Sequence, residues 1–505
     1  MAKSTTDLLA QLRAQLAPVT DLQAAGAVLH WDQATYMPAG GAAARGRQLA
    51  TLSQVAHEKA TAPALGQLLE QLRPLERELP PDSTDAALIR VARRDYERAI
   101  KVPGELVAEI SRHTSATYEA WTRARPANDF AAVQSLLEKT LTLSRRLANC
   151  FPGYAHLADP LIDYADEGVT VAVLRPLFAE LRRELVPLAE AITARPVSDD
   201  ACLRQPFPEP AQRAFGEDVI RAFGFDFERG RQDKTHHPFM ISFSTGDVRI
   251  TTRYKEADLG EGLFSTLHEA GHALYEQGIA ATLEGTPLAG GASAGVHESQ
   301  SRLWENVVGR SRGFWHHFYP RLQSVFPAQL GRVDLATFVR AINKVERSLI
   351  RTDADEVTYN LHVMIRFDLE LALLTGELAV RDLPAAWRER YRADLGVTPP
   401  DDRDGVLQDV HWFHGLIGGA FQCYTLGNIL SAQFFEAACR AQPAIPPEIE
   451  AGRFGLLHDW LRQHVYRHGA TFTPPELVRR ATGQPLRVEP YRRYLRQKFG
   501  ELYGV

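Results

Sequence analysis

Apolar residues recur at spacings of three and four along most of the chain, which is the pattern of helices that bury one face. Turn-forming runs separate these stretches, such as Thr-Pro-Pro-Asp-Asp at 398–402. The pattern predicts helices over residues 4–17, 43–77, 84–101, 103–123, 129–149, 172–195, 209–223, 258–278, 297–324, 335–350, 355–375, 383–395, 411–440, 446–467 and 474–499.

One segment has a different character. Residues 239–244 and 248–254 are short runs that contain β-branched and aromatic side chains, and they flank the turn sequence Thr245-Gly-Asp. They predict a β-hairpin immediately before helix 258–278. Because strands are so few, we expect an all-α (mainly helical) fold with one small β-hairpin or sheet.

The helical pattern extends over the whole chain, without internal repeats or low-complexity segments. Its 505 residues would allow roughly two to four domains by length alone. We expect a single domain over 1–505, with an N-terminal helical lobe at roughly 1–125 and a catalytic helical body at 126–505.

Composition excludes several classes of protein. The formal net charge is -5 and there is no basic stripe, which argues against a nucleic-acid partner. Residues 4–17 read as an amphipathic surface helix instead of a signal peptide, and no apolar run approaches the roughly 18 residues of a membrane span. The four cysteines lack Cys-x-x-Cys spacing, which fits a reducing compartment. We therefore expect a cytoplasmic protein that does not bind membranes.

The clearest chemical signal is His268-Glu-Ala-Gly-His272, inside the predicted helix 258–278. In a helix the two histidines lie one turn apart on one face, so both imidazoles can reach a single metal ion. Glu269 lies beside that face and can accept a proton from a water molecule, as in zinc peptidases. The alternative is a pair of histidines that make only structural hydrogen bonds. We favour the metal site.

A catalytic zinc ion needs a third protein ligand and one open position. Glu298 follows the Gly- and Ala-rich stretch 289–295, so the chain can turn back there and carry this carboxylate toward the histidines. Glu305 is the rival ligand, because it lies two turns further along and nearly in line with Glu298. We favour Glu298. In that case Glu305 is a buried partner of an arginine or supports a ligand from behind.

Recognition of a terminal carboxylate needs a cation, and the planar arginine fork can bind a carboxylate at two points. Arg249 in the hairpin and Arg351 in the segment 350–355 are the candidates, although a single arginine is more often a surface or ion-pair residue.

Two further side chains could serve the same site. His411 lies in the segment 405–412 beside an aspartate and a tryptophan, and the alternative for this segment is an ordinary helix start. The phenol of Tyr424 could donate to a developing oxyanion, and the alternative is a core aromatic residue.

Several motifs occur together, in the order of a known family. They are Trp31-Asp-Gln-Ala-Thr-Tyr-Met-Pro-Ala-Gly-Gly41, His237-Pro-Phe239, Asp247-Val-Arg249-Ile-Thr251, His268-Glu-Ala-Gly-His272, His297-Glu-Ser-Gln300, Ile350-Arg-Thr-Asp-Ala-Asp355 and Gly405-Val-Leu-Gln-Asp-Val-His-Trp412. With these motifs the sequence resembles the carboxypeptidase Taq family of zinc metallopeptidases. The length also fits, so the resemblance covers essentially the whole chain.

The resemblance implies a saddle-like helical fold with a deep central groove, similar to that of neurolysin, and it implies a homodimer. It implies one zinc ion per chain, for which cobalt can substitute. The ligands that it implies are His268, His272 and Glu298, with Glu269 as the catalytic base.

The resemblance also assigns the substrate's C-terminus to the region of Arg351, with Arg249 and His411 lining the site. It adds His237 and Tyr424 to the same region. For the second-layer acceptor of a histidine ligand we expect Asp355.

The sequence as a whole predicts a zinc-dependent metallocarboxypeptidase that removes C-terminal residues from peptides with broad specificity. We expect the substrate to lie extended along the edge of the hairpin. Two alternatives stay open: a zinc oligopeptidase that cuts internally, and a zinc-containing peptide-binding scaffold without turnover.

Overall fold

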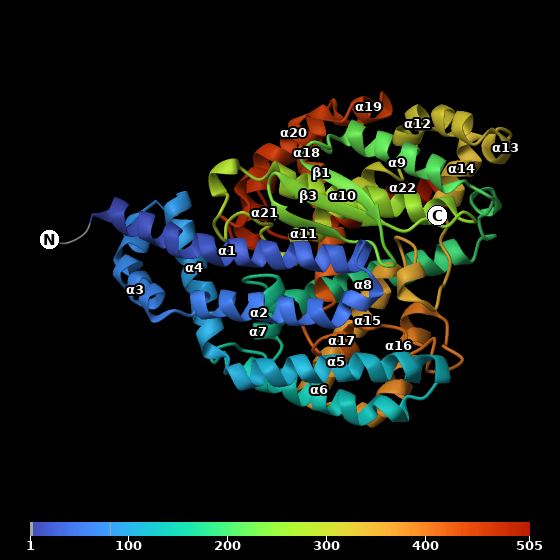
Figure 1. The fold of residues 1–505 in the computed structure, drawn as a ribbon. Coiled ribbons are helices and arrows are strands. Elements are labelled where there is room, and N and C mark those ends of the chain that lie inside the picture. The colour runs from blue at the N-terminus through green and yellow to red at the C-terminus, as the bar shows by residue number, and fades with distance from the viewer. Residues whose placement is uncertain (1–3, 81) are drawn as a thin grey trace.

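The computed structural model describes residues 4–80 and 82–505, and helices make up most of it (Figure 1). The mainly helical fold class predicted from the sequence is confirmed. In the first half of the chain the α-helices are α1 (Thr5–Thr35), α2 (Ala42–Ala60), α3 (Pro63–Glu78), α4 (Thr84–Lys101), α5 (Gly104–Ala127), α6 (Ala131–Asn149), α7 (Asp159–Ala165), α8 (Val171–Thr193) and α9 (Glu209–Phe223).

The second half contains the helices that carry the chemical motifs. They are α10 (Leu259–Gly278), α11 (Ala294–Arg302), α12 (Arg312–Val325), α13 (Pro327–Leu330), α14 (Leu335–Ile342), α15 (Tyr359–Thr375), α16 (Leu383–Leu395), α17 (His411–His414), α18 (Gln422–Ala441), α19 (Ile445–Glu450), α20 (Gly455–His464), α21 (Pro474–Thr482) and α22 (Glu489–Tyr503). A π-helix, Leu303–Val308, follows α11 directly.

Several predicted helices have different bounds. The helix predicted to end at residue 17 continues through Pro18 to Thr35. The regular spacing of apolar residues therefore covers only the first part of this helix. The predicted helix 411–440 is interrupted between α17 and α18, where Gly418 and Gly419 have φ of 104° and 77°. Glycine adopts this left-handed conformation without the penalty that a Cβ imposes, and a helix cannot continue through it.

The predicted hairpin is present as β2 (Met240–Ser244) and β3 (Asp247–Thr252), which pair antiparallel. A third strand, β1 (Gly230–Lys234), pairs parallel with β3, so the sheet order is β1-β3-β2 and β2 is an edge strand. Strand β1 was not predicted from the sequence, because its residues are mostly polar. Its buried Gln232 donates to Thr266 of α10 (Nε2 to Oγ1, 2.7 Å), so a tertiary partner stabilises this strand.

The buried apolar residues form two clusters. One surrounds α10 and includes Leu267 and Leu274, together with Leu12 and Leu88 from the N-terminal helices. The other gathers around α15, α16 and α18. The division into a lobe at 1–125 and a body at 126–505 stays a prediction. Among the described residues, no helix is both long and apolar enough to cross a membrane.

One buried carboxyl group makes stability depend on pH. Glu370 of α15 is 1% exposed, accepts a hydrogen bond from Trp412 (Nε1 to Oε1, 2.8 Å), and burial raises its pKa from 4.5 to about 7. Between these two values the native protein keeps a proton that the unfolded chain releases. The contribution of this group is therefore complete at low pH and is lost as the pH rises through about 7.

We predict that Glu370→Gln flattens the pH dependence of stability. Because the substitution removes the titrating group, the decline in unfolding free energy between pH 4 and 8 should shrink by up to about 3 kcal/mol. Denaturant unfolding at several pH values measures the decline, with the exposed Glu389→Gln as the control. An unchanged slope in Glu370→Gln would contradict the prediction.

Candidate metal centre

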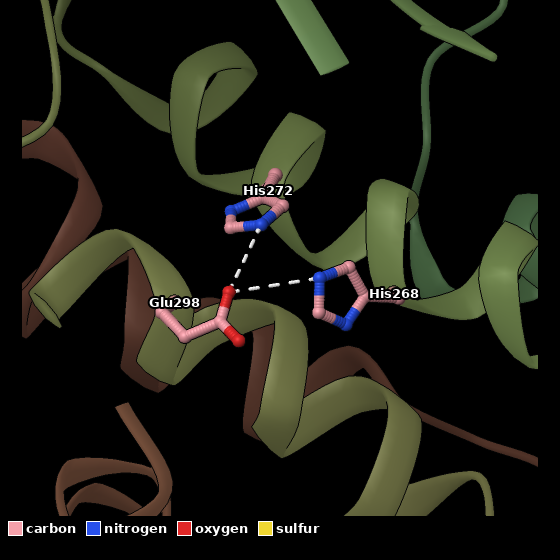
Figure 2. A group of neighbouring side chains, drawn as sticks. All are labelled: His268, His272 and Glu298. Carbon is pink, nitrogen blue, oxygen red and sulfur yellow. Dashed lines mark ion pairs between the residues drawn. The ribbon is translucent and has the colours of Figure 1, made fainter. Parts of the chain in front are cut away.

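His268, His272 and Glu298 converge on one point, as Figure 2 shows. Both histidines project from α10, which begins at the cap Asp258 and ends at Gly278, the helix stop expected from the sequence. Glu298 comes from α11, which Ser293 caps. Its Oε2 lies 3.6 Å from Nε2 of His268 and 3.4 Å from Nε2 of His272.

Two glycines allow α11 to lie close enough for this convergence. A Cβ on Gly271 of α10 would lie 2.5 Å from the carbonyl oxygen of Gln300, and a Cβ on Gly427 of α18 would lie 2.4 Å from Cγ of Glu298. Real Cβ atoms do not approach other atoms so closely, so any larger residue at either position would push α11 away. The glycine inside the His268–His272 motif is thus part of the site geometry.

The hydrogen bonds behind the histidines fix their tautomers. Nδ1 of His268 lies 2.9 Å from Oε2 of Glu305, and because a carboxylate only accepts, this nitrogen donates. In its neutral form His268 then presents the lone pair of Nε2 toward Glu298; against the effect of burial, Glu298 and Glu305 raise the pKa of this ring. This places Glu305 behind a ligand, which is one of the roles that the sequence left open for it.

His272 is oriented by a longer relay. Its Nδ1 lies 2.7 Å from Nδ1 of His297, whose Nε2 lies 2.9 Å from Oε1 of Glu276. Because Glu276 accepts, His297 donates from Nε2 and accepts at Nδ1, so His272 donates from Nδ1 and presents a lone pair at Nε2. Burial lowers the pKa of His272 to about 4, which keeps this ring neutral.

The expectation for Asp355 is wrong. Its carboxylate accepts from the backbone N–H groups of Glu346, Val357 and Thr358, and so it stabilises the turn before α15. Partners of the two histidines are Glu305 and His297 instead. Spacing along the chain could not show which carboxylate folds behind the ligand histidines.

Burial and charge set different protonation states for the carboxyl groups. Burial, reinforced by the nearby carboxylates Glu298 and Glu305, raises the pKa of Glu269 to about 7, and the side chain is 7% exposed. Burial would also raise the pKa of Glu298, but the adjacent guanidinium group of Arg302 holds it well below its usual range. Glu298 is therefore an anion, whereas Glu269 can take up or release a proton near neutral pH.

The donor set fits a divalent metal ion. In the neutral tautomers set by Glu305 and His297, two nitrogen lone pairs and one carboxylate oxygen face one another, which is a suitable donor set for a divalent cation. Tetrahedral zinc with ligand bonds of about 2.0–2.1 Å separates its ligand atoms by about 3.3 Å, close to the 3.4 and 3.6 Å found here. Among the residues that the structure describes, His268, His272 and Glu298 form a group whose ligand atoms lie close enough together to hold a metal ion.

The predicted carboxylate-binding residues form a second cluster. Arg351, which is 5% exposed, pairs with Asp409 (Nη2 to Oδ1, 2.7 Å), and its guanidinium carbon lies 5.4 Å from the ring centroid of Tyr424. Nε2 of His411 lies 3.1 Å from Oη of Tyr424. Burial lowers the pKa of His237, with smaller contributions from the positive charges of Arg253 and Arg351.

Arg249 lies apart from this cluster. It forms a two-point ion pair with Asp247 on the same strand, and its guanidinium carbon lies 4.3 Å from the ring centroid of Trp31 and 4.9 Å from that of Phe243. The N-terminal motif that begins at Trp31 thus packs against the sheet. The structure brings Arg249 into contact with neither the metal centre nor Arg351, and its role stays a prediction.

Arg302 and Tyr359, which had no role assigned from the sequence, connect the metal centre with the cluster around Arg351. Arg302 binds Glu298 (Nε to Oε1, 2.7 Å), and its guanidinium carbon lies 4.7 Å from the ring centroid of Tyr359. The hydroxyl of Tyr359 in turn accepts from Arg351 (Nη1, 3.0 Å). The spacing of four between Glu298 and Arg302 was a signal for the first contact, whereas nothing in the sequence indicated the second.

A helical fold that holds two histidines and a glutamate around one point, beside a buried glutamate of raised pKa, defines the class of metallopeptidases. The model of one such family, described as "Carboxypeptidase Taq (M32) metallopeptidase", matches residues 11–499, and the chain belongs to this family.

The chain matches individual relatives along nearly their whole length. The chain is 44% identical to thermostable carboxypeptidase 1 of Thermus thermophilus, over 96% of each chain. The crystal structure of an M32 carboxypeptidase from Deinococcus radiodurans superposes with a TM-score of 0.96 at 51% identity, covering 99% of this chain and 100% of that one. Trypanosoma cruzi metallocarboxypeptidase 1 gives 0.93 at 31% identity, covering 98% and 100%. The family resemblance and the fold expected from it are confirmed.

We predict that His297→Ala weakens zinc binding. Without the acceptor at Nδ1 of His297, His272 loses the partner that fixes its tautomer, and losses of this kind are typically about 10- to 100-fold in affinity. Competition against a fluorescent chelator measures the zinc dissociation constant. His316→Ala, whose side chain is 64% exposed on α12, is the control and should bind zinc as the unmodified protein does. If His297→Ala and His316→Ala bind zinc with equal affinity, the relay does not contribute to metal binding.

Proposed function

We propose that this carboxypeptidase is zinc-dependent, acts with broad specificity on peptide C-termini, and uses Glu269 as its general base. The observation that supports the proposal most strongly is the convergence of His268, His272 and Glu298 next to the buried Glu269, with Nδ1 of each histidine hydrogen-bonded from behind. His268, His272 and Glu298 would hold the metal. When bound, zinc would acidify a water molecule and polarise the scissile carbonyl.

Glu269 would carry the proton through the reaction. With a pKa of about 7 it is poised to accept a proton from the attacking water and later to deliver it to the leaving amine. Its burial keeps bulk water from competing for that proton. The metal ligands themselves are unsuited to this role, because Glu298 is held as an anion by Arg302.

Tyr424 and His411 are the candidates for stabilising the oxyanion. Burial raises the pKa of Tyr424 far above its usual range, so the phenol stays protonated and can donate. Burial and the nearby Arg351 lower the pKa of His411 to about 4, so its ring is neutral at neutral pH. The hydrogen bond between the two side chains lets His411 orient the phenol.

Arg351 would bind the substrate's C-terminal carboxylate and so set the position of cleavage. The contact chain from Glu298 through Arg302 and Tyr359 to Arg351 supports this role, because it connects the metal centre to the carboxylate site through packed side chains. Strand β2 is an edge strand of the sheet, and an extended peptide could pair with it. Arg249 and His237 would line the path of the substrate.

The two alternatives make different demands on these residues. An internally cutting oligopeptidase would not need a buried arginine dedicated to a terminal carboxylate. A scaffold without turnover would not need Glu269, since a purely structural zinc site fills its positions with protein ligands.

Three further properties belong to the same proposal. We propose that zinc is the physiological metal and that cobalt can replace it, because nitrogen and oxygen ligands accept both ions. The cytoplasmic location is supported by the four cysteines, all of which are free thiols. The homodimer rests on the family resemblance.

We predict that Glu269→Gln retains zinc but loses about 10²- to 10⁴-fold in kcat, because the amide keeps the shape of the side chain without its basicity. Metal analysis and steady-state kinetics on one peptide measure both quantities. A zinc-loaded variant with the rate of the unmodified enzyme would contradict the general-base role.

For Arg351→Ala we predict a large loss of kcat/KM on peptides with a free C-terminus and little change on C-terminally amidated ones. The reason is that only the free carboxylate uses the charge of the guanidinium group. Kinetics on a matched pair of peptides measure the effect, and Arg249→Ala serves as the comparison. Equal losses on both peptides would remove Arg351 from substrate recognition.

A further inference from the structure

Asp409 is shared between two buried arginines. Its Oδ1 accepts from Nη2 of Arg351 at 2.7 Å, and its Oδ2 accepts from Nε of Arg366. Arg366 of α15 is 0% exposed, Arg351 is 5% exposed and Asp409 is 8% exposed. The two guanidinium groups therefore have a single carboxylate between them, and this three-residue cluster has a net charge of +1.

The nearest titratable groups do not cancel that charge. Burial lowers the pKa of His362 and His411, and burial raises the pKa of Tyr391 and Tyr424, so all four are neutral at neutral pH. Glu370 lies one turn along α15 from Arg366 and accepts from Trp412; burial raises its pKa to about 7 against the smaller effect of Arg366, so this carboxyl is mostly protonated below that pH. The excess positive charge is thus a property of Arg351, Arg366 and Asp409.

The two arginines differ in their remaining hydrogen-bonding capacity. Besides Asp409, Arg366 donates to the carbonyl of His362, to Tyr391 and to Gln408, so four of its five N–H groups have partners in the protein. Arg351 donates once from each nitrogen, to Asp409 and Tyr359. Among the described residues, two N–H groups of Arg351 therefore remain for a ligand.

We propose that Arg366 is a positioning residue for substrate recognition: by sharing Asp409, it leaves Arg351 with uncompensated charge and two donors for the substrate's C-terminal carboxylate. This inference rests on the proposed role of Arg351. Alone with Asp409, Arg351 would form a neutral buried pair, and an incoming carboxylate would be repelled by Asp409 as strongly as it is attracted. Arg366 offsets that repulsion while remaining out of reach of the substrate.

Substitutions that change the net charge of the cluster by known amounts test the proposal. An N-acetylated alanine tetrapeptide and its C-terminal amide are the substrates, and the zinc-loaded enzyme is compared with R366M, D409N and the double variant R366M/D409N. The cluster charge is +1 in the unmodified enzyme, 0 in R366M, +2 in D409N and +1 again in the double variant. R366K keeps the charge. R182M is the control, because Arg182 is a partly buried arginine outside this cluster that pairs with two carboxylates, Asp368 and Asp394.

For the free-acid peptide we expect R366M to raise KM at least tenfold, with a smaller effect on kcat. The double variant should recover most of that loss. The KM of D409N, R366K and R182M should stay within threefold of the KM of the unmodified enzyme. Rescue by a second substitution in the same buried cluster is a result that simple structural damage does not produce. Circular dichroism and zinc content establish that each variant is folded and loaded.

Several results would overturn the inference. They are an unchanged KM in R366M, a double variant at least as impaired as R366M, or a tenfold rise of KM in D409N. If R366M does not fold, the D409N measurement decides. Failure of the proposed function is distinguishable, because the unmodified enzyme would then cleave the amide as readily as the free acid, and both proposals would fall.

Discussion

The site depends on how closely α11 lies between α10 and α18. Gly271 and Gly427 leave no room for a Cβ against the backbone of Gln300 and the side chain of Glu298. Because this packing fixes both the distance and the rotation of α11, Glu298 faces Nε2 of both ligand histidines while His297, one residue earlier, lies behind His272. One helix of nine residues thus supplies a metal ligand and the support of another ligand.

The same helix connects the metal centre to the site of substrate recognition. Arg302 at its end holds Glu298 ionised and packs on Tyr359, whose hydroxyl binds Arg351. The next turn is a π-helix, and it carries Glu305 behind His268. Wide turns of this kind are common at functional sites. Two buried charged clusters, one around Glu298 and one around Asp409, are therefore joined by packed side chains over a short path.

Much of this arrangement was predictable from periodicity and spacing. The helical class, the β2–β3 hairpin, the end of α10 at Gly278 and the convergence of His268, His272 and Glu298 all follow from local patterns. What could not be predicted depends on tertiary packing. The polar strand β1 forms because of partners far along the chain, the carboxylate behind His268 is Glu305 instead of Asp355, and the sharing of Asp409 by Arg366 has no sequence signature.

The most direct test of metal-dependent removal of C-terminal residues is mass-spectrometric analysis of the products from one unblocked peptide and its C-terminal amide, with chelator and after zinc is restored. The account predicts stepwise shortening from the free C-terminus alone, abolished by chelator and recovered with zinc. Internal cleavage of both peptides, or no cleavage after zinc is restored, would contradict it.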